Sequence, residues 1–230
     1  MTPDSAVLRA TDLTISVANR TLIRSACFAV AAGECVGLTG PNGSGKSTLL
    51  RTVAGRLDGG GGRISYGGMI TDAIGGWRHG IGYMPADLDA PGLLTLDEYF
   101  QVVAAARGLR STEWPGRVAD LMEALRLTAH RDCALSDLST GTAKKVGFAT
   151  AMLHRPPLLL CDEPFEGLDG ESANAVTDLV REHLGRGGAA LICTHRTRFI
   201  AGLAHSVLTV SEGKIHVAEP AVSEGSGADD

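Results

Sequence analysis

One stretch constrains the fold of this chain more than any other, the sequence GPNGSGKS from Gly40 to Ser47. It fits the spacing G-x-x-x-x-G-K-[ST], it follows the apolar run ECVGLTG, and residues 47–56 carry the apolar spacing of a helix. In such a strand, loop and helix, backbone N–H groups and the helix N-terminus point toward one anion. The sequence therefore predicts a phosphate-binding loop in an α/β fold, and the alternative is a plain glycine turn at a helix start.

Each residue of this loop has an expected role toward a bound nucleotide. Lys46 would reach the β and γ phosphates and count among the catalytic groups, and Ser47 would place its hydroxyl on Mg²⁺. The predicted nucleotide contacts are Gly40, Pro41, Asn42, Gly43, Ser44, Gly45, Lys46, Ser47 and Thr48.

Two acidic residues follow a second apolar run, LLLCDEPFEGLD, at residues 158–169. In phosphoryl transfer, an acid at the end of a buried strand holds the Mg²⁺ shell, and the next acid polarises the attacking water. We assign the first role to Asp162 and the second, catalytic role to Glu163. An acidic pair alone is usually a solvated strand end, but its position downstream of the phosphate-binding loop favours the functional interpretation.

His195 ends the apolar run ALICTH. A histidine at the top of a sheet can hydrogen-bond a γ-phosphate. Beside the other motifs we expect this catalytic role for His195, and the alternative is an exposed histidine at a strand end.

The rest of the chain predicts one domain over residues 1–217. Residues 6–39 alternate like antiparallel strands around the turn VANRT, residues 58–62 read as a flexible glycine connection, and residues about 90–153 as an inserted helical lobe. From residue 158 onward, apolar strands alternate with helices predicted at 171–184 and 196–204. The expected fold is an α/β P-loop NTPase fold with a central, mainly parallel sheet, an N-terminal antiparallel β subdomain and an inserted α-helical subdomain.

Charge and cysteine usage exclude several classes of protein. The formal net charge is -5, no basic stripe is visible, and residues 218–230 form an acidic tail that we expect to be disordered, so no nucleic-acid partner is predicted. No apolar run approaches the roughly 18 residues needed to span a bilayer, and we see no signal peptide. The cysteines lack C-x-x-C spacing and are expected to be small, reduced and buried; they are Cys27, Cys35, Cys133, Cys161 and Cys193.

With these motifs in order, residues 6–217 resemble the nucleotide-binding subunit of an ATP-binding cassette (ABC) transporter of the short exporter type. The resemblance implies that the chain binds ATP and Mg²⁺, hydrolyses ATP, and forms a homodimer or a heterodimer with another cassette. It also implies a separate membrane-spanning permease subunit as partner, which would hold the otherwise cytoplasmic chain on the cytoplasmic face of the membrane.

The stretch LSTGT at residues 138–142 occupies the place of the family's signature LSGGQ. In that family the signature of one subunit closes on the ATP held by the other. The resemblance therefore implies that Ser139 and Gly141 contact ATP across a dimer, and that Asp169, in the loop after the acidic pair, is also an ATP contact. The alternative is a plain helix cap, since Ser139 is a favoured capping residue.

Two positions depart from the family's pattern. Ala86, in YMPA, stands where a glutamine usually contacts Mg²⁺ and water, and Val17 stands where an aromatic residue usually stacks on adenine. Two other hypotheses stay open: a soluble cassette ATPase with no transport role, and a degenerate, regulatory half-site in a heterodimer whose partner supplies the active chemistry.

Overall fold

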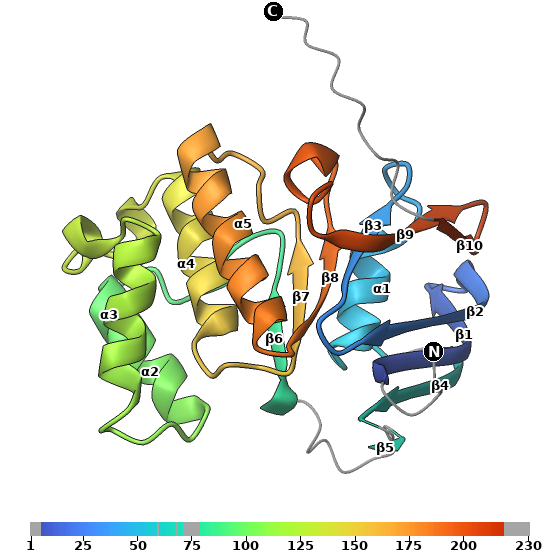
Figure 1. The fold of residues 1–230 in the computed structure, drawn as a ribbon, viewed down its shortest axis with the longest axis horizontal. Coiled ribbons are helices and arrows are strands. Elements are labelled where there is room, and N and C mark those ends of the chain that lie inside the picture. Colours follow the sequence, from blue (N-terminus) through green and yellow to red (C-terminus); the bar gives the residue numbers. More distant parts are fainter. Residues whose placement is uncertain (1–5, 59, 68, 71–78, 219–230) are drawn as a thin grey trace, which may run out of the picture.

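The central feature of the computed structural model is a six-stranded sheet (Figure 1). The structure describes residues 6–58, 60–67, 69–70 and 79–218. Four of the neighbouring strand pairs are parallel and the edge strand β10 is antiparallel to β9, so the predicted, mainly parallel sheet is confirmed. The order across the sheet is β10 (Lys214–Ala218), β9 (Ala204–Ser211), β3 (Cys35–Thr39), β8 (Ala189–Cys193), β7 (Leu158–Asp162) and β6 (Ile81–Met84).

A second, antiparallel sheet is built mainly from the N-terminal residues, as predicted. Its order is β2 (Arg20–Ala31), β1 (Ala6–Val17), β4 (Gly61–Tyr66) and β5 (Met69–Ile70). The turn between β1 and β2 is made by Ala18 and Asn19, which both adopt positive φ, at 47° and 64°. Two such residues twist the chain in the sense that a tight hairpin needs.

Helix α1 (Lys46–Val53) packs between the two sheets (Figure 1). Its Leu49, Leu50 and Val53 are fully buried in one apolar cluster with residues of both sheets. The helix ends before the predicted limit at residue 56, because Gly55 adopts φ 65° and lets the N–H of Arg56 bond back to the carbonyl of Arg51 at 2.8 Å.

The remaining α-helices share a second apolar cluster on the other side of the central sheet, where two of them pack on the strands and the other two pack on the outer side of that pair. They are α2 (Leu96–Ala106), α3 (Trp114–Ala124), α4 (Thr140–Met152) and α5 (Gly170–Gly185), with short 3₁₀ turns at Thr128–His130, Leu135–Asp137 and Thr197–Phe199. Thr95 and Glu98 form a capping box that begins α2. Helix α4 lies against β6, where a Cβ on Gly82 would stand 2.2 Å from the carbonyl oxygen of Ala151.

Besides the early end of α1, two local predictions of secondary structure were wrong. The helix predicted at 196–204 is only the 3₁₀ turn Thr197–Phe199, because Gly202 disfavours a helix and the chain enters β9 at Ala204. The glycine connection at 58–62 ends early, since Gly61 and Gly62 already belong to β4.

Gly62 passes so close to β1 that a Cβ on it would stand 2.3 Å from the carbonyl oxygen of Asp12. The prediction that all five cysteines are buried was wrong for two of them: Cys27 is exposed on the outer face of β2, and Cys133 is half-buried. Apart from Ala218 in β10, the predicted disordered tail lies outside the described residues.

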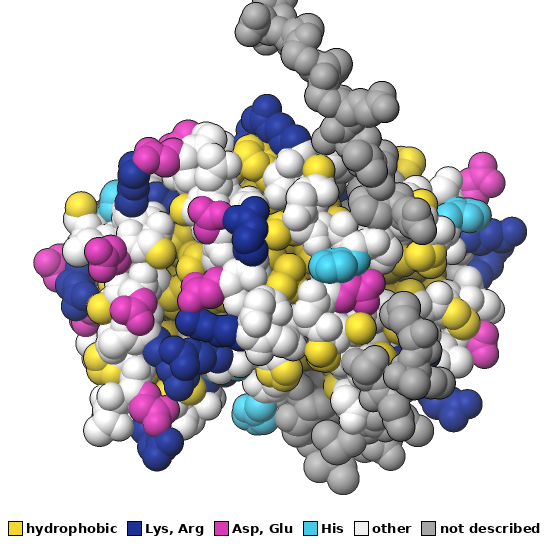
Figure 2. All heavy atoms as spheres, viewed as in Figure 1, with side chains coloured by type: hydrophobic (Ala, Val, Ile, Leu, Met, Phe, Trp, Pro, Cys, Tyr) yellow, Lys and Arg dark blue, Asp and Glu magenta, His cyan; other side chains and the backbone are white. Residues whose placement is uncertain are grey.

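Within the described ranges, every helix is too short or too polar to cross a membrane. On the face shown in Figure 2, acidic and basic side chains are interspersed rather than gathered by sign.

Candidate functional site

The glycine loop lies between the carboxyl end of β3 and the start of α1, as predicted. Gly40 and Gly45 adopt φ 140° and 105°, and a Cβ on Gly40 would meet the carbonyl oxygen of Val210 at 2.3 Å. Only glycine fits such a position, where the backbone turns away from β3 against β9. Helix α1 has no acidic residue in its first turn, so nothing on the helix itself offsets the positive end of its dipole.

Lys46 is folded over this loop. Its side chain is largely buried, and Nζ donates hydrogen bonds to the carbonyl oxygens of Gly40 at 2.7 Å and Pro41 at 3.0 Å. The carbonyl oxygens of the loop therefore hold the ammonium group of Lys46 directly beside the position that a bound phosphate would occupy.

The acidic pair ends β7. Asp162 is 1% exposed, and its Oδ2 is a buried oxygen with no hydrogen-bond partner among the described residues. A buried, unpartnered carboxylate oxygen is costly unless a cation or water binds it. Such an oxygen suits a hard divalent cation such as Mg²⁺, and the hydroxyl of Ser47, which lines the same cavity, would be a second oxygen ligand.

The side chain of Glu163 points in a different direction from that of Asp162, because the backbone of Glu163 adopts φ 51°. Its N–H donates to the carbonyl of Cys193 at 2.8 Å, and its Oε2 accepts the backbone N–H of His195 at 3.2 Å. The Oε1 atom lies 3.5 Å from Nε2 of His195, whose side chain is half exposed. The structure thus brings two of the three predicted catalytic side chains, Glu163 and His195, into contact at the ends of β7 and β8.

Cys193 lies beneath this pair, with Sγ 3.9 Å from Oε1 of Glu163. Burial, followed by the carboxylates of Asp162 and Glu163, raises the pKa of this thiol far above its usual range. The thiol therefore stays neutral and does not compete with Glu163 as a base.

These groups line one cavity of about 600 Å³. Of the predicted residues, its walls include Asn42, Gly43, Gly45, Lys46, Ser47, Thr48, Asp162, Glu163 and His195. Gly40, Pro41 and Ser44 complete the loop but do not line the cavity. A cavity with backbone N–H groups, a lysine, an unpartnered acid and a hydroxyl fits a nucleoside triphosphate with its cation.

The three residues predicted from the signature and the following loop are not in that lining. Ser139 caps α4, and its Oγ accepts the N–H of Thr142 at 3.1 Å. Asp169 caps α5, and the backbone N–H of Ser172 at 2.7 Å lowers the pKa of its carboxyl. Gly141 lies against the carbonyl oxygen of Gly167, 2.9 Å from where a Cβ would be. Within one chain, Ser139 and Asp169 therefore act as helix caps.

Sequence analysis missed two side chains at the site. Lys144, from α4, contacts the backbone of Glu163, and Arg196 donates from Nη1 to the carbonyls of Phe165 at 3.0 Å and Leu168 at 2.9 Å. Long side chains that bond to carbonyls far away in sequence leave no periodic signal. Only the adjacency of Arg196 to His195 could have drawn attention to it.

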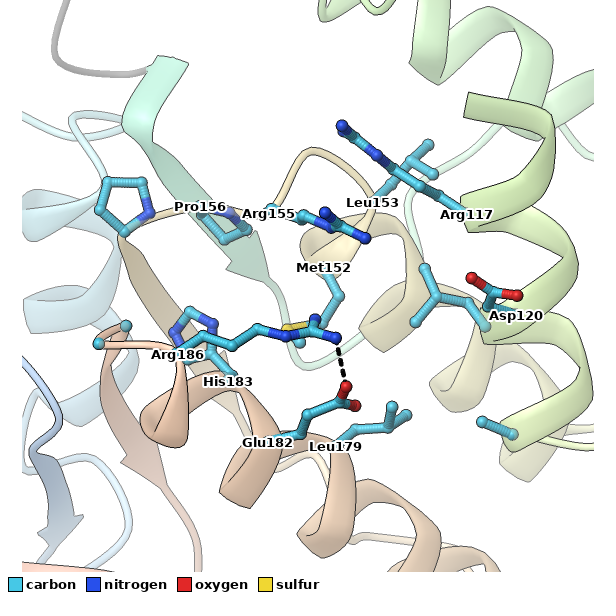
Figure 3. Close-up of a pocket in the computed structure, with 15 residues that line it drawn as sticks. Arg117, Asp120, Met152, Leu153, Arg155, Pro156, Leu179, Glu182, His183 and Arg186 are labelled. Carbon is cyan, nitrogen blue, oxygen red and sulfur yellow. Dashed lines mark hydrogen bonds and ion pairs between the residues drawn. The ribbon is translucent and has the colours of Figure 1, made fainter. Parts of the chain in front are cut away.

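Two further cavities lie away from the predicted residues. One of about 500 Å³ lies between α3, the end of α4 and α5 and carries Arg117, Arg155 and Arg186, the last of which pairs with Glu182 (Figure 3). Another of about 560 Å³ is lined by residues of α1, α2, α4 and the segment after β6. Ala86 belongs to the walls of both this cavity and the one beside Lys46.

Comparison with known proteins agrees with this geometry. Residues 23–166 match the family model described as ABC transporter. The chain is 37% identical to the cytochrome c biogenesis ATP-binding export protein CcmA of Cupriavidus pinatubonensis, over 83% of this chain and 84% of that protein. It is 33% identical to Nod factor export ATP-binding protein I of Mesorhizobium japonicum, over 84% of this chain but only 58% of that protein.

A solved structure of an ATP-binding subunit of an ABC transporter superposes with a TM-score of 0.87 at 29% identity, over 93% of this chain and 90% of that one. The family match, the identity to a protein covered along most of its length and the shared fold agree with the cavity described above. The chain belongs to the ABC transporter family and is one of its ATP-hydrolysing cassettes.

Proposed function

We propose that this chain is the ATP-binding and hydrolysing subunit of an exporter, and that it energises transport through a separate membrane-spanning permease subunit. The relatives support export, since one is an ATP-binding export protein of cytochrome c biogenesis and the other is an ATP-binding protein of Nod factor export. In this proposal the chain lies in the cytoplasm, on the membrane face where its partner holds it.

The proposed roles follow the contacts in the cavity. Lys46 and the loop N–H groups bind the phosphates, and Ser47 and Asp162 bind Mg²⁺, which would neutralise phosphate charge as it develops. Glu163 accepts the proton of the attacking water, and His195 beside it holds the γ-phosphate side of the cavity. We also propose that residues 40–48 contact the nucleotide and that residues 1–217 form a single ABC ATPase domain.

We propose a dimer because three predicted ATP contacts lie outside the cavity that contains Lys46 and Glu163. They are Ser139, Gly141 and Asp169. Ser139 and the N-terminus of α4 are exposed, and an exposed helix N-terminus can face an anion. A second cassette, identical or related, would bring its own Ser139 and Gly141 to this chain's ATP. Closure of two chains on two ATP molecules and reopening after hydrolysis would then move the permease.

The cavity of about 560 Å³ beside Ala86 is the proposed place for a cytoplasmic helix of the permease. It lies between the helical lobe and the segment after β6, and Ala86 connects its wall to the ATP cavity. A nucleic-acid partner is not part of this proposal.

The first test is the Glu163→Gln variant of the purified chain. We expect its ATP turnover to fall by about 100-fold or more, because a neutral amide cannot accept a proton, while ATP binding is retained. With hydrolysis blocked, light scattering should record a dimer that forms only with Mg²⁺ and ATP.

The matched control adds Ser139→Arg to the same variant. A large cation at the helix N-terminus should prevent the dimer without changing ATP binding by the single chain, since Ser139 does not line that chain's own cavity. Unchanged turnover in Glu163→Gln would refute the catalytic role of Glu163. A chain that binds ATP and hydrolyses it yet stays monomeric in every state would refute the homodimer and direct the search to a second cassette.

A further inference from the structure

Lys144 is a buried lysine outside the walls of the ATP cavity. It lies in α4, the helix that Ser139 caps, and its side chain is only 5% exposed. A buried ammonium group is stable only where several acceptors surround it. The groups that accept hydrogen bonds from Lys144 therefore indicate which segments of the chain this side chain holds together.

The Nζ atom of Lys144 joins three separate segments. It donates to the carbonyl oxygen of Ala86, to the carbonyl oxygen of Glu163 at 3.3 Å, and to Oε2 of Glu166 at 3.5 Å. Because the carboxylate of Glu166 is two-thirds exposed, the two backbone carbonyls are the partners that hold the ammonium group in the interior.

The contact with Glu163 bears on the orientation of its carboxylate. Glu163 has the left-handed backbone conformation that is unfavourable for a residue with a side chain. Its N–H is bound by the carbonyl of Cys193, and its own carbonyl is bound by Lys144. With both backbone groups held, the side chain is directed toward His195 rather than along β7.

The contact with Ala86 connects this orientation to a second cavity. Ala86 lines the ATP cavity and also the cavity of about 560 Å³ beside the helical lobe. In Figure 1, α4 runs alongside β6 and β7, so Lys144 reaches the segments that follow both strands. An occupant that displaces the segment at Ala86 would take away one acceptor of Lys144 and change its hold on Glu163.

We propose that Lys144 is a positioning residue, which fixes the backbone of Glu163 for water activation and couples it to the segment at Ala86. The inference rests on the proposed function of Glu163 as the base. Lys144 does not touch ATP in this account, since it is absent from the walls of the ATP cavity.

The test measures ATP affinity and turnover separately in two variants of the full chain. Lys144→Met keeps an unbranched side chain only one atom shorter and removes the charge and the donors, whereas Lys144→Arg keeps a cation with donors. Lys214→Met, on the exposed edge strand β10, is the matched control for loss of a lysine. Binding is titrated with the slowly hydrolysed analogue ATPγS, and turnover by phosphate release.

We expect Lys144→Met to lower kcat by about 10- to 100-fold, because small misplacements of a catalytic group cost this much. Its affinity for ATPγS should stay within about threefold of wild type, and Lys144→Arg should recover at least about a third of wild-type kcat. The Lys214→Met control should match wild type in both measurements.

The inference is overturned if Lys144→Met keeps kcat within about threefold of wild type, if its affinity falls by the same factor as kcat, or if Lys144→Arg is as slow as Lys144→Met. Should Lys144→Met fail to fold, the kcat of Lys144→Arg is compared with that of wild type. A kcat of at least about a third of the wild-type value is the expected result, and a lower kcat overturns the inference. Wild type and Glu163→Gln are measured alongside: equal rates for these two refute the proposed function, whereas a loss in Glu163→Gln alone refutes only the inference.

Discussion

Replacing His154 should make the free energy of unfolding of this protein depend less on pH on the acid side of neutrality. His154 follows α4 in a partly buried turn, where burial, and then the charge of Arg107, lowers the pKa of its imidazole from 6.5 to about 4. The charges of His79 and Arg117 lower this pKa further, and the backbone of Ile81 offsets part of the effect.

The sign follows from which state binds the proton first. Since the folded-state pKa lies below the unfolded value, the unfolded chain is protonated first as the pH falls. Stability is therefore lost between about pH 6.5 and pH 4, and the contribution is constant below that range. The fall in pKa sets a ceiling of about 3 kcal/mol, which solvent screening at a partly buried group reduces to about 1–2 kcal/mol.

The contribution of His154 to stability is measured by urea unfolding of wild type, His154→Gln and His154→Leu at a series of pH values. The two variants differ in packing and polarity and should differ in stability near neutral pH, yet neither titrates. Relative to each variant, wild type should lose about 1–2 kcal/mol of unfolding free energy between pH 6.5 and pH 4. A difference that stays constant within about 0.3 kcal/mol across that range would refute the reasoning.

Further predictions concern a close backbone contact and the phosphate-binding lysine. Gly82→Ala should lower the free energy of unfolding by about 1–3 kcal/mol, because its Cβ would stand 2.2 Å from the carbonyl oxygen of Ala151. Gly116→Ala, in α3 with nothing within 4 Å of the new Cβ, should instead raise it by about 0.5–1 kcal/mol, and equal effects in denaturant titrations would contradict both. Lys46→Met should weaken ATP binding by about 10- to 100-fold in calorimetric titration, and unchanged affinity would exclude a contact with phosphate.

Motifs with a fixed local geometry predicted the architecture well. The spacing from Gly40 to Ser47 requires a strand before it and a helix after it, and both are present as β3 and α1. The apolar runs after residue 158 predicted buried parallel strands, which β7 and β8 are. In these cases the sequence neighbours themselves determine the geometry.

Predictions failed where distant contacts decide the structure. The residues after His195 have helical composition, but the chain must enter β9 beside β3, which leaves room for only one 3₁₀ turn. The glycines at 61 and 62 look like a linker, yet they let β4 approach β1 closely. The bond from Lys144 to Glu163 joins positions 19 residues apart, through a side chain that no periodic pattern singles out.

The left-handed backbone of Glu163 has a consequence for protein engineering. Glycine or asparagine would adopt φ 51° at less cost than glutamate, by about 1 kcal/mol. Selection of variants for thermal resistance alone would therefore favour glycine or asparagine at position 163 and discard the carboxylate. Libraries built to stabilise this cassette should keep position 163 constant, because there folding and turnover select for different amino acids.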